Sequence, residues 1–520
     1  MNLILAVLPI YFAPQDWTAL PLPEPSLPRT RVEVDFPASR GRHLRFGQWE
    51  SDPAAEESAE IPAGLVVQWL QEEARRRGSQ LAIAPSTPPL LVSGTAEDLA
   101  WARDLVSGLD DIGRRLEVQV DAWLVPNSIA TDPGPAALDA RAEVRRWNGN
   151  VRSGDSLLFG DPRRRAFLAD YEVEVATDSG VAAPVIGQAL TGEQLYVSAH
   201  RVDSGRAVQV FGLLDLAELD RIEEFDPGTP DLGSTEQPVV DLAQVCFSGR
   251  VVAGESLRVA LKGTAVGGGD WTLFLRASTS ADPAEAPGVG WRALDLSLLA
   301  SEPMELVGMH AGTSLAHHAR LSELTSQHSS TPPSGVLALL GRDRRRDIER
   351  PPVQWTDRLL LVHSDDAERH RELRSLVTEL ESIRSQTTLC HVEQGELIVE
   401  FPVASGQPAR VLVGSERTVL IDYDAEIAPN TWMPAPRSEA IFDGLAWQAR
   451  LQGADLIGEC FRSETNTIRV RQRGQASLGA VQLPDRRHAT GRGRLSAGGQ
   501  AAWIPAGPGR SALLVSRGTL

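Results

Sequence analysis

The stretch LLVSGTAEDLAWARDLVSGLDDIGRRLEVQVDAWLV, residues 90–125, predicts a short buried strand, a helix and a second strand in succession. Thr95 and Asp98 have the spacing of a capping box, which starts a helix with reciprocal hydrogen bonds. Apolar residues then recur at helical spacing and predict one buried helix face: Leu99, Ala102, Leu105, Val106 and Leu109. The last apolar residues alternate with polar ones, which is typical of a half-buried strand: Leu116, Val118, Val120, Ala122 and Leu124.

The chain repeats part of itself at a fixed spacing. DYEVEVA, residues 170–176, returns as DYDAEIA, residues 422–428, so that Asp170 and Asp422 lie 252 positions apart. Nine residues find an identical residue 252 positions later: Arg165, Leu168, Asp170, Tyr171, Glu174, Ala176, Ala183, Pro184 and Gly192. Because internal repeats determine architecture, we expect the two stretches to fold alike.

The repeat extends in both directions. LLLVHSDDAERHRELRSLVTELES, residues 359–382, corresponds to the strand and helix of residues 90–111, with Asp365 and Glu368 as capping residues. Its predicted buried face is Leu373, Leu376, Val377 and Leu380. Downstream, each copy continues as strand, glycine turn and strand, and then as a hairpin: 237–263 and 263–277 in the first copy, 483–507 and 507–518 in the second.

These patterns predict an α+β, β-rich fold of two tandem units, each a small βαβ module followed by an antiparallel β region. We divide the chain into a signal-like and irregular N-terminal region (1–60), unit 1 (61–280), a connector (281–334) and a divergent unit 2 (335–520). A length of 520 residues fits this division, since roughly two to four domains are expected at that size.

Charge and composition exclude some classes of function. The formal net charge is −18 and the isoelectric point is about 5.1, so the surface repels phosphate backbones and no nucleic-acid partner is expected. Three cysteines are too few for a disulfide framework, and their spacing fits no zinc site: Cys246, Cys390 and Cys460. We expect them to be buried thiols.

Residues 3–13 form an apolar run of signal-peptide length, which favours export to the periplasm or the outer membrane. No basic residue precedes the run, so a buried N-terminal strand and a cytoplasmic location stay open. No uninterrupted apolar stretch approaches 18 residues, so we expect no transmembrane helix.

Residues 90–125 resemble the end of a periplasmic N-domain of the bacterial secretins of type II and type III secretion systems, running into their C-terminal region. The matching positions are Leu91, Val92, Gly94, Thr95, Asp98, Leu99, Ala102, Leu105, Val106, Leu109 and Asp110. VCFSGRVVAGESLRVAL, with Gly254 at its turn, resembles the hairpin of the same family. The resemblance covers roughly 60–280, and 335–518 more faintly. It implies an envelope protein that forms homo-oligomers or binds other envelope proteins.

The acidic stripes are the first candidate site. On a strand, Asp170, Glu172 and Glu174 share one face, while Tyr171, Val173 and Val175 share the other. In the second copy the acidic face is Asp422, Asp424 and Glu426, and the inward face is Tyr423, Ala425 and Ile427. Two such carboxylates can hold Ca²⁺ or act as an acid–base pair, but no loop adds the further oxygen ligands that Ca²⁺ needs. We interpret both stripes as solvent faces that discourage pairing between sheets.

Other chemical motifs also lead to no site. The connector histidines lack metal-ligand spacing: His310, His317, His318 and His328. GTAVGGGDW, residues 263–271, lacks the lysine of a phosphate loop and precedes a strand. The sequence therefore predicts no catalytic, cofactor-binding or metal-binding residue and no cofactor.

Three functions follow from these observations. The favoured hypothesis is a non-enzymatic, secretin-like envelope protein with a structural or assembly role. Aromatic residues make up only 5% of the chain, fewer than an aromatic belt at a membrane requires, which leaves open a soluble periplasmic binding or adhesion protein on the same duplicated scaffold. The remote alternative is a hydrolase that uses Glu174 and Glu426.

Overall fold

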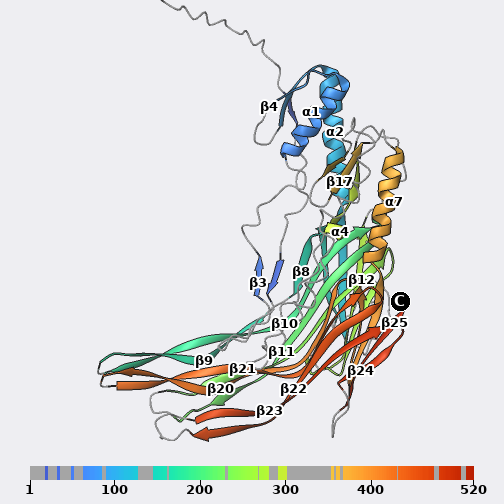
Figure 1. Cartoon of the computed structure of the whole chain (residues 1–520). Coiled ribbons are helices and arrows are strands. Elements are labelled where there is room, and N and C mark those ends of the chain that lie inside the picture. Colours follow the sequence, from blue (N-terminus) through green and yellow to red (C-terminus); the bar gives the residue numbers. More distant parts are fainter. Residues whose placement is uncertain are drawn as a thin grey trace, which may run out of the picture.

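Long antiparallel strands make up most of the protein, and the helices gather at one end of an elongated body (Figure 1). The computed structural model describes residues 18–20, 32–35, 48–51, 63–84, 90–126, 144–160, 163–177, 179–228, 232–266, 269–279, 291–300, 353–355, 359–363, 367–429, 431–472, 480–504 and 511–519. The predicted β-rich character of the fold is confirmed.

Two large sheets form the body. The eight-stranded sheet contains, in spatial order, β24 (Gln500–Ile504), β25 (Leu513–Thr519), β18 (Thr387–Gln394), β19 (Leu397–Ala404), β13 (Leu257–Lys262), β14 (Trp271–Thr279), β6 (Glu117–Pro126) and β7 (Arg145–Arg152). The nine-stranded sheet contains β23 (Ala480–Ser496), β22 (Asp455–Gln472), β21 (Thr431–Gln452), β20 (Pro408–Ala428), β12 (Thr235–Val252), β11 (Ala207–Phe225), β10 (Gly180–Val202) and β8 (Ser156–Gly160), with β9 (Arg163–Val175) paired to β10.

Each sheet contains the same strand order twice. We call β6 to β14 set 1 and β18 to β25 set 2. In the eight-stranded sheet, β24-β25-β18-β19 of set 2 is followed by β13-β14-β6-β7 of set 1. In the nine-stranded sheet, β23-β22-β21-β20 is followed by β12-β11-β10-β8, with β8 and β9 together in the place of β20. The two sets therefore lie head to tail in both sheets.

The backbone irregularities recur at the same places in the two sets. Ala169 of β9 and Ile421 of β20 are bulged out of register, 252 positions apart. Asp220 of β11 and Asn466 of β22 are likewise bulged, 246 positions apart. Because a bulge bends and twists its strand, the two sets bend at equivalent positions.

The main core lies between the two sheets. On β12, Ala243, Val245 and Phe247 alternate into this core, as the period of a strand requires. Its fully buried tryptophan is Trp447 of β21, whose ring lies 6.0 Å from that of Phe401 and 5.6 Å from that of Trp503. Both sets and both sheets contribute to this core, so it is shared between them.

A small sheet and two helices precede set 1. Helices α1 (Ala63–Arg77) and α2 (Ala96–Arg115) pack with β1 (Thr18–Leu20), β5 (Leu90–Ser93) and β4 (Ala82–Ala84). The predicted capping box is confirmed: the Asp98 N–H donates to the Thr95 hydroxyl at 3.1 Å, and the Thr95 N–H donates to the Asp98 carboxylate at 3.1 Å. Hydrogen bonds from Ser79 and Thr95 hold the pKa of Asp98 at about 2.

A second small sheet accompanies set 2. It contains β15 (Trp291–Asp295), β17 (Leu359–His363) and β16 (Val353–Trp355), and it lies near α4 (Ser297–Ala300) and α7 (Ala367–Arg384). Leu373 and Val377 of α7 pack against Leu294, as the predicted buried face requires. A separate hairpin is formed by β2 (Val32–Asp35) and β3 (Gln48–Ser51).

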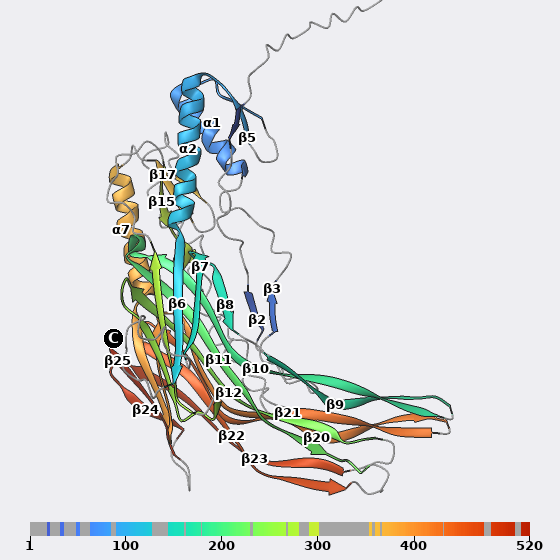
Figure 2. The same ribbon diagram turned by 180° about the vertical axis from the view of Figure 1, so that it is seen from behind.

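The strand–helix–strand order is present, but it is not a βαβ module within one sheet. β5 lies in a small sheet while β6 lies in the eight-stranded sheet, and β17 and β18 are separated in the same way. The physical reason is length: a helix of 20 residues such as α2 advances the chain by about 30 Å, from one sheet to the other (Figure 2). The strand expected to be half-buried also differs, since Trp123 and Val125 are buried on its second face.

Among the residues that the structure describes, no helix combines the length and apolar character needed to cross a membrane. The signal-like run of residues 3–13 lies outside the described residues.

Candidate assembly site

The two acidic stripes lie on equivalent strands, β9 and β20. Glu172 and Glu174 are exposed, as are Asp424 and Glu426, which agrees with the predicted solvent face. The tyrosines occupy matching positions: the Tyr171 hydroxyl lies against Gly233, and the Tyr423 hydroxyl donates to the Ala480 carbonyl at 3.2 Å.

Two expectations about the stripes are wrong. Asp170 was expected on the solvent face but is fully buried, and it lies near enough to Tyr423 of β20 to raise the pKa of that tyrosine. Its carboxylate accepts the Tyr171 N–H at 2.8 Å, a bond repeated between Asp422 and Tyr423. Ile427 was expected to point inward but is exposed.

The other candidate groups form no site in the part of the chain that the structure describes. Within it, no three His, Cys, Asp or Glu side chains are arranged to hold a metal ion. The three cysteines are buried thiols that form no disulfide with one another, and burial raises the pKa of each thiol to about 12. The connector histidines His310, His317, His318 and His328 fall outside the described residues.

The junction between set 1 and set 2 brings the two halves of the chain together. In the nine-stranded sheet, β12 pairs with β20 from Val239↔Arg417 to Cys246↔Arg410. In the eight-stranded sheet, β13 pairs with β19 at Ala260↔Glu400 and its two neighbours. The Ala404 N–H also donates to the Ser248 hydroxyl at 2.7 Å, across the same junction. Both sheets therefore continue from one set into the other.

A buried charged pair lies at this junction. Asp215 of β11 and Arg410 of β20 are both buried. On β12, which lies between these strands, Gln244 is opposite Asp215 and Cys246 is opposite Arg410. Burial raises the pKa of Asp215 to about 6, against the opposing effects of the Gln244 hydrogen bond and Arg410. Burial also lowers the pKa of Arg410 to about 10. Asp215 of set 1 and Arg410 of set 2 attract each other electrostatically across this junction.

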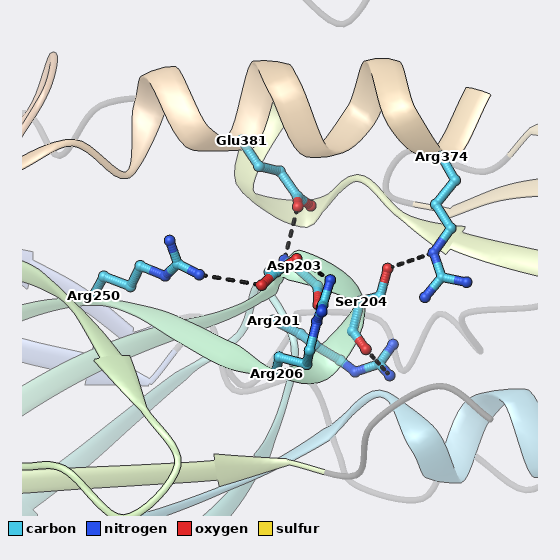
Figure 3. Close-up of polar contacts among 7 residues, drawn as sticks. All are labelled: Arg201, Asp203, Ser204, Arg206, Arg250, Arg374 and Glu381. Carbon is cyan, nitrogen blue, oxygen red and sulfur yellow. Dashed lines mark hydrogen bonds and ion pairs between the residues drawn. The ribbon is translucent and has the colours of Figure 1, made fainter. Parts of the chain in front are cut away.

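A polar clasp joins the helix layer to the strands (Figure 3). We define the clasp as the contact between α7 and the turn Asp203–Gly205, which connects β10 to β11. The Asp203 N–H donates to the Glu381 carboxylate at 2.9 Å, and Arg374 donates to the Ser204 hydroxyl at 2.8 Å. Asp203, Ser204 and Gly205 have φ values of 51°, 55° and 79°, so the turn is held in a left-handed conformation.

The clasp concentrates buried charge. Glu381 and Asp295 line one small cavity with Arg201 and Arg374. Burial is the main cause that raises the pKa of Glu381 to about 8, and the nearby Asp295 and Asp203 act in the same direction. The Asp203 N–H and Arg201 oppose this rise. Sequence patterns did not indicate the clasp, since Asp203 and Glu381 lie 178 positions apart and neither belongs to a motif.

The far ends of the strands form two stacked ribbons (Figures 1 and 2). Ribbon 1 is Arg163–Thr191, which is β9 with the first part of β10, and ribbon 2 is Ser415–Asp443, which is the last part of β20 with the first part of β21. Ribbon 1 leaves the nine-stranded sheet at Gly192, where φ is 114°. It packs on ribbon 2 through Val173 and Val175, which contact a cluster that includes Met433. Ribbon 1 of set 1 thus covers ribbon 2 of set 2.

The fold and its junction define a class: a two-sheet antiparallel β-protein in which one four-strand order occurs twice, head to tail. Among solved structures the chain is similar to the secretin InvG of the Salmonella SPI-1 type III secretion injectisome, at 13% identity and a TM-score of 0.20, over 49% of this chain and 86% of that one. A structure of the InvG secretin domain gives 13% identity and a TM-score of 0.21, over 64% of this chain and 99% of that one. No protein-family model and no curated protein matches the sequence.

Proposed function

We propose that the chain is a non-enzymatic structural component of a secretin-like assembly in the bacterial envelope, periplasmic or associated with the outer membrane. In this proposal it comprises two units, residues 61–280 and 335–520, joined by the connector 281–334. The observation that carries the proposal is the junction, where both sheets continue from one set into the other and helix α7 contacts the turn between β10 and β11. The resemblance of residues 90–125 to secretins supports the same role.

The ends of the sheets support assembly. Among the described strands, the outermost strands of set 2 are β23 and β24, one in each large sheet. The outermost strands of set 1 are β7, β8 and β9. The backbone groups along such edge strands are templates for pairing with another chain. A protein whose function is assembly needs such edges, whereas an enzyme needs a cleft with convergent polar groups.

Fractionation and sedimentation test this function. We expect the full chain, made in a bacterial host with its N-terminal region, to occur in the envelope fraction and to sediment as a particle larger than one chain. The gradient is run with and without outer-membrane lipid. A monomer in the cytoplasmic fraction would contradict the proposal.

A second experiment addresses the hydrolase alternative. The double variant Glu174→Gln and Glu426→Gln changes two exposed carboxylates and is expected to leave the envelope assembly unchanged. Glycan cleavage by the unaltered chain that is lost in this variant would favour the hydrolase instead.

A further inference from the structure

The clasp holds helix α7 to the turn between β10 and β11 through polar contacts (Figure 3). The Asp203 N–H donates to the Glu381 carboxylate at 2.9 Å, and Arg374 donates to the Ser204 hydroxyl at 2.8 Å. Asp203 and Ser204 have φ values of 51° and 55°, which residues other than glycine rarely adopt. Such a conformation persists only where surrounding contacts hold it, so the turn depends on the clasp.

Helix α7 also has contacts that do not involve the turn. Val377 lies with Leu294 of β15 in one buried apolar cluster. Arg384, at the end of α7, donates to the carbonyl oxygen of Leu298 in α4 at 2.7 Å. Neither contact requires Glu381, so α7 can stay on β15 and α4 when its contact with the turn is lost.

Glu381 is the buried acid of the clasp. It is 5% exposed and lines one small cavity with Asp295. The charged groups that face it come from the turn, β10, β15 and α7 itself: Asp203, Arg201, Asp295 and Arg374. Two further arginines, Arg206 and Arg250, form ion pairs with Asp203 at 2.8 and 3.3 Å. Because carboxylates that share a buried site repel one another, this arrangement favours a protonated Glu381 while the clasp is closed.

The balance of effects on Glu381 gives the direction of the change. Burial is the largest effect and raises the pKa of Glu381, the Asp203 N–H and Arg201 lower it, and the charges of Asp295 and Asp203 raise it. The pKa is about 8 in the closed clasp, against 4.5 for an exposed glutamate. Between about pH 5 and 8 the closed clasp therefore holds a proton that an open, hydrated Glu381 releases, and each further pH unit favours opening by up to about tenfold.

We propose that the clasp is a pH-sensitive latch, in which loss of the Glu381 proton releases the turn Asp203–Gly205 from helix α7 while α7 stays on β15. The proton passes to water, and the carboxylate becomes hydrated as the turn moves away. At low pH the latch couples α7, which leads into β18 of set 2, to the strands of set 1. At high pH the two sets stay joined by the strand pairs of the junction. This device regulates a contact within the chain and goes beyond the assembly role proposed above.

Hydrogen exchange of the purified full chain, followed by mass spectrometry, tests the latch. The Asp203 amide donates to Glu381 when the clasp is closed, so its exchange reports release of the turn. We expect exchange of the turn, corrected for the intrinsic rate of a free amide at each pH, to rise by about tenfold or more from pH 6 to pH 8. Glu381→Gln keeps an acceptor for the Asp203 N–H but does not titrate, so we expect no such rise in this variant.

Three comparisons make the measurement specific to the latch. Glu379→Gln changes an exposed glutamate on the same helix, is the matched control and should keep the full rise. Amides within α7 should show no comparable rise, and those of β12, inside the nine-stranded sheet, should exchange more slowly than the turn at every pH. The latch would be overturned by an absent rise in the unaltered chain, an equal rise in Glu381→Gln, or an equal rise within α7. A turn that exchanges only as slowly as β12 would also overturn it, because exchange would then require global unfolding.

Discussion

Ribbon 1 and ribbon 2 share a bulge, a tyrosine and an acidic face, yet equivalent positions of the two ribbons differ in burial. Positions that are buried in ribbon 2, such as Met433, are exposed in ribbon 1, where the counterpart is Val181. The position that makes the contact from ribbon 1, Val175, is exposed in ribbon 2 as Ile427. The difference comes from the neighbour and not from the local fold.

This comparison teaches that a repeated unit has to be understood with its neighbours. At the junction, set 1 and set 2 are each other's neighbours, because β12 pairs with β20. Asp215 of set 1 and Arg410 of set 2 are buried there. At the two ends the same elements recur without that partner among the described residues. Four experiments break or sharpen the comparison.

The largest difference is expected between Met433→Asp and Val181→Asp. Met433→Asp removes a buried side chain and places a charge in an apolar cluster, so we expect the free energy of unfolding to fall by about 4 kcal/mol. Val181→Asp changes the same position of the repeat where it is exposed, and we expect a change of within about 0.5 kcal/mol. Urea unfolding measures both. Similar losses of unfolding free energy in the two variants would mean that ribbon 1 does not cover ribbon 2 at Met433.

Gly444→Ala tests the close approach of β20 and β21 at the base of ribbon 2. Gly444 has a φ of 159° and faces Gly414 across the strand pair, and a Cβ on it would lie 2.3 Å from the Val413 carbonyl oxygen. We expect a loss of about 3 kcal/mol in unfolding free energy, because backbone would have to shift. Gly108→Ala is the control: a Cβ there meets nothing within 4 Å, and an alanine in helix α2 stabilises it by about 1 kcal/mol. Equal effects of the two substitutions would rule out the close approach at Gly444.

Local patterns predicted much of the fold. The capping box at Thr95 and the apolar face of α2 follow from spacing within one element. The turn at Gly254 does so as well, since its φ value of 88° favours glycine.

Sequence patterns predicted less of the candidate site than of the fold. The burial of Asp170 depends on its place near Tyr423 of the other set, 253 positions away, which has no signature in the local sequence. The exposure of Ile427 depends on which ribbon covers which, and the clasp joins residues that only the tertiary fold brings together. These features arise from long-range packing.

Glu381→Gln tests whether titration of Glu381 in the clasp makes the free energy of unfolding depend on pH. Glu381 has a pKa of about 8 in the folded protein, above the 4.5 of an exposed glutamate. Between about pH 5 and 8 the folded state holds a proton that the unfolded state releases, so the free energy of unfolding falls as pH rises. Glutamine keeps an acceptor for the Asp203 N–H and does not titrate, so we expect the variant to lose about 2 kcal/mol of this pH dependence.

Urea unfolding from pH 5 to pH 8 measures this effect. Asp215 has a raised pKa of about 6 and gives a slope of the same sign, confined to the lower part of the range, in both proteins. The groups that face Glu381 are Asp203, Asp295 and Arg201, and they are unchanged in the variant. An unchanged slope between pH 6 and 8 would show that Glu381 is not the titrating group of the clasp.

The smallest effect is expected at the start of helix α2, away from the junction. The Asp98 carboxylate accepts hydrogen bonds from the Thr95 N–H at 3.1 Å and the Trp101 indole at 3.2 Å, and it also accepts from Ser79. Asp98→Ala removes these bonds, and we expect a loss of about 1 kcal/mol in unfolding free energy. The folded pKa of about 2 is below that of a free aspartate, so this contribution is present above about pH 4 and disappears as the pH falls toward 2. Asp104→Ala, an exposed position on the same helix, is the control and should have little effect. Because α2 lies outside the two large sheets, Asp98→Ala should leave self-association of the chain unchanged. A loss of self-association would mean that the start of helix α2 takes part in the assembly.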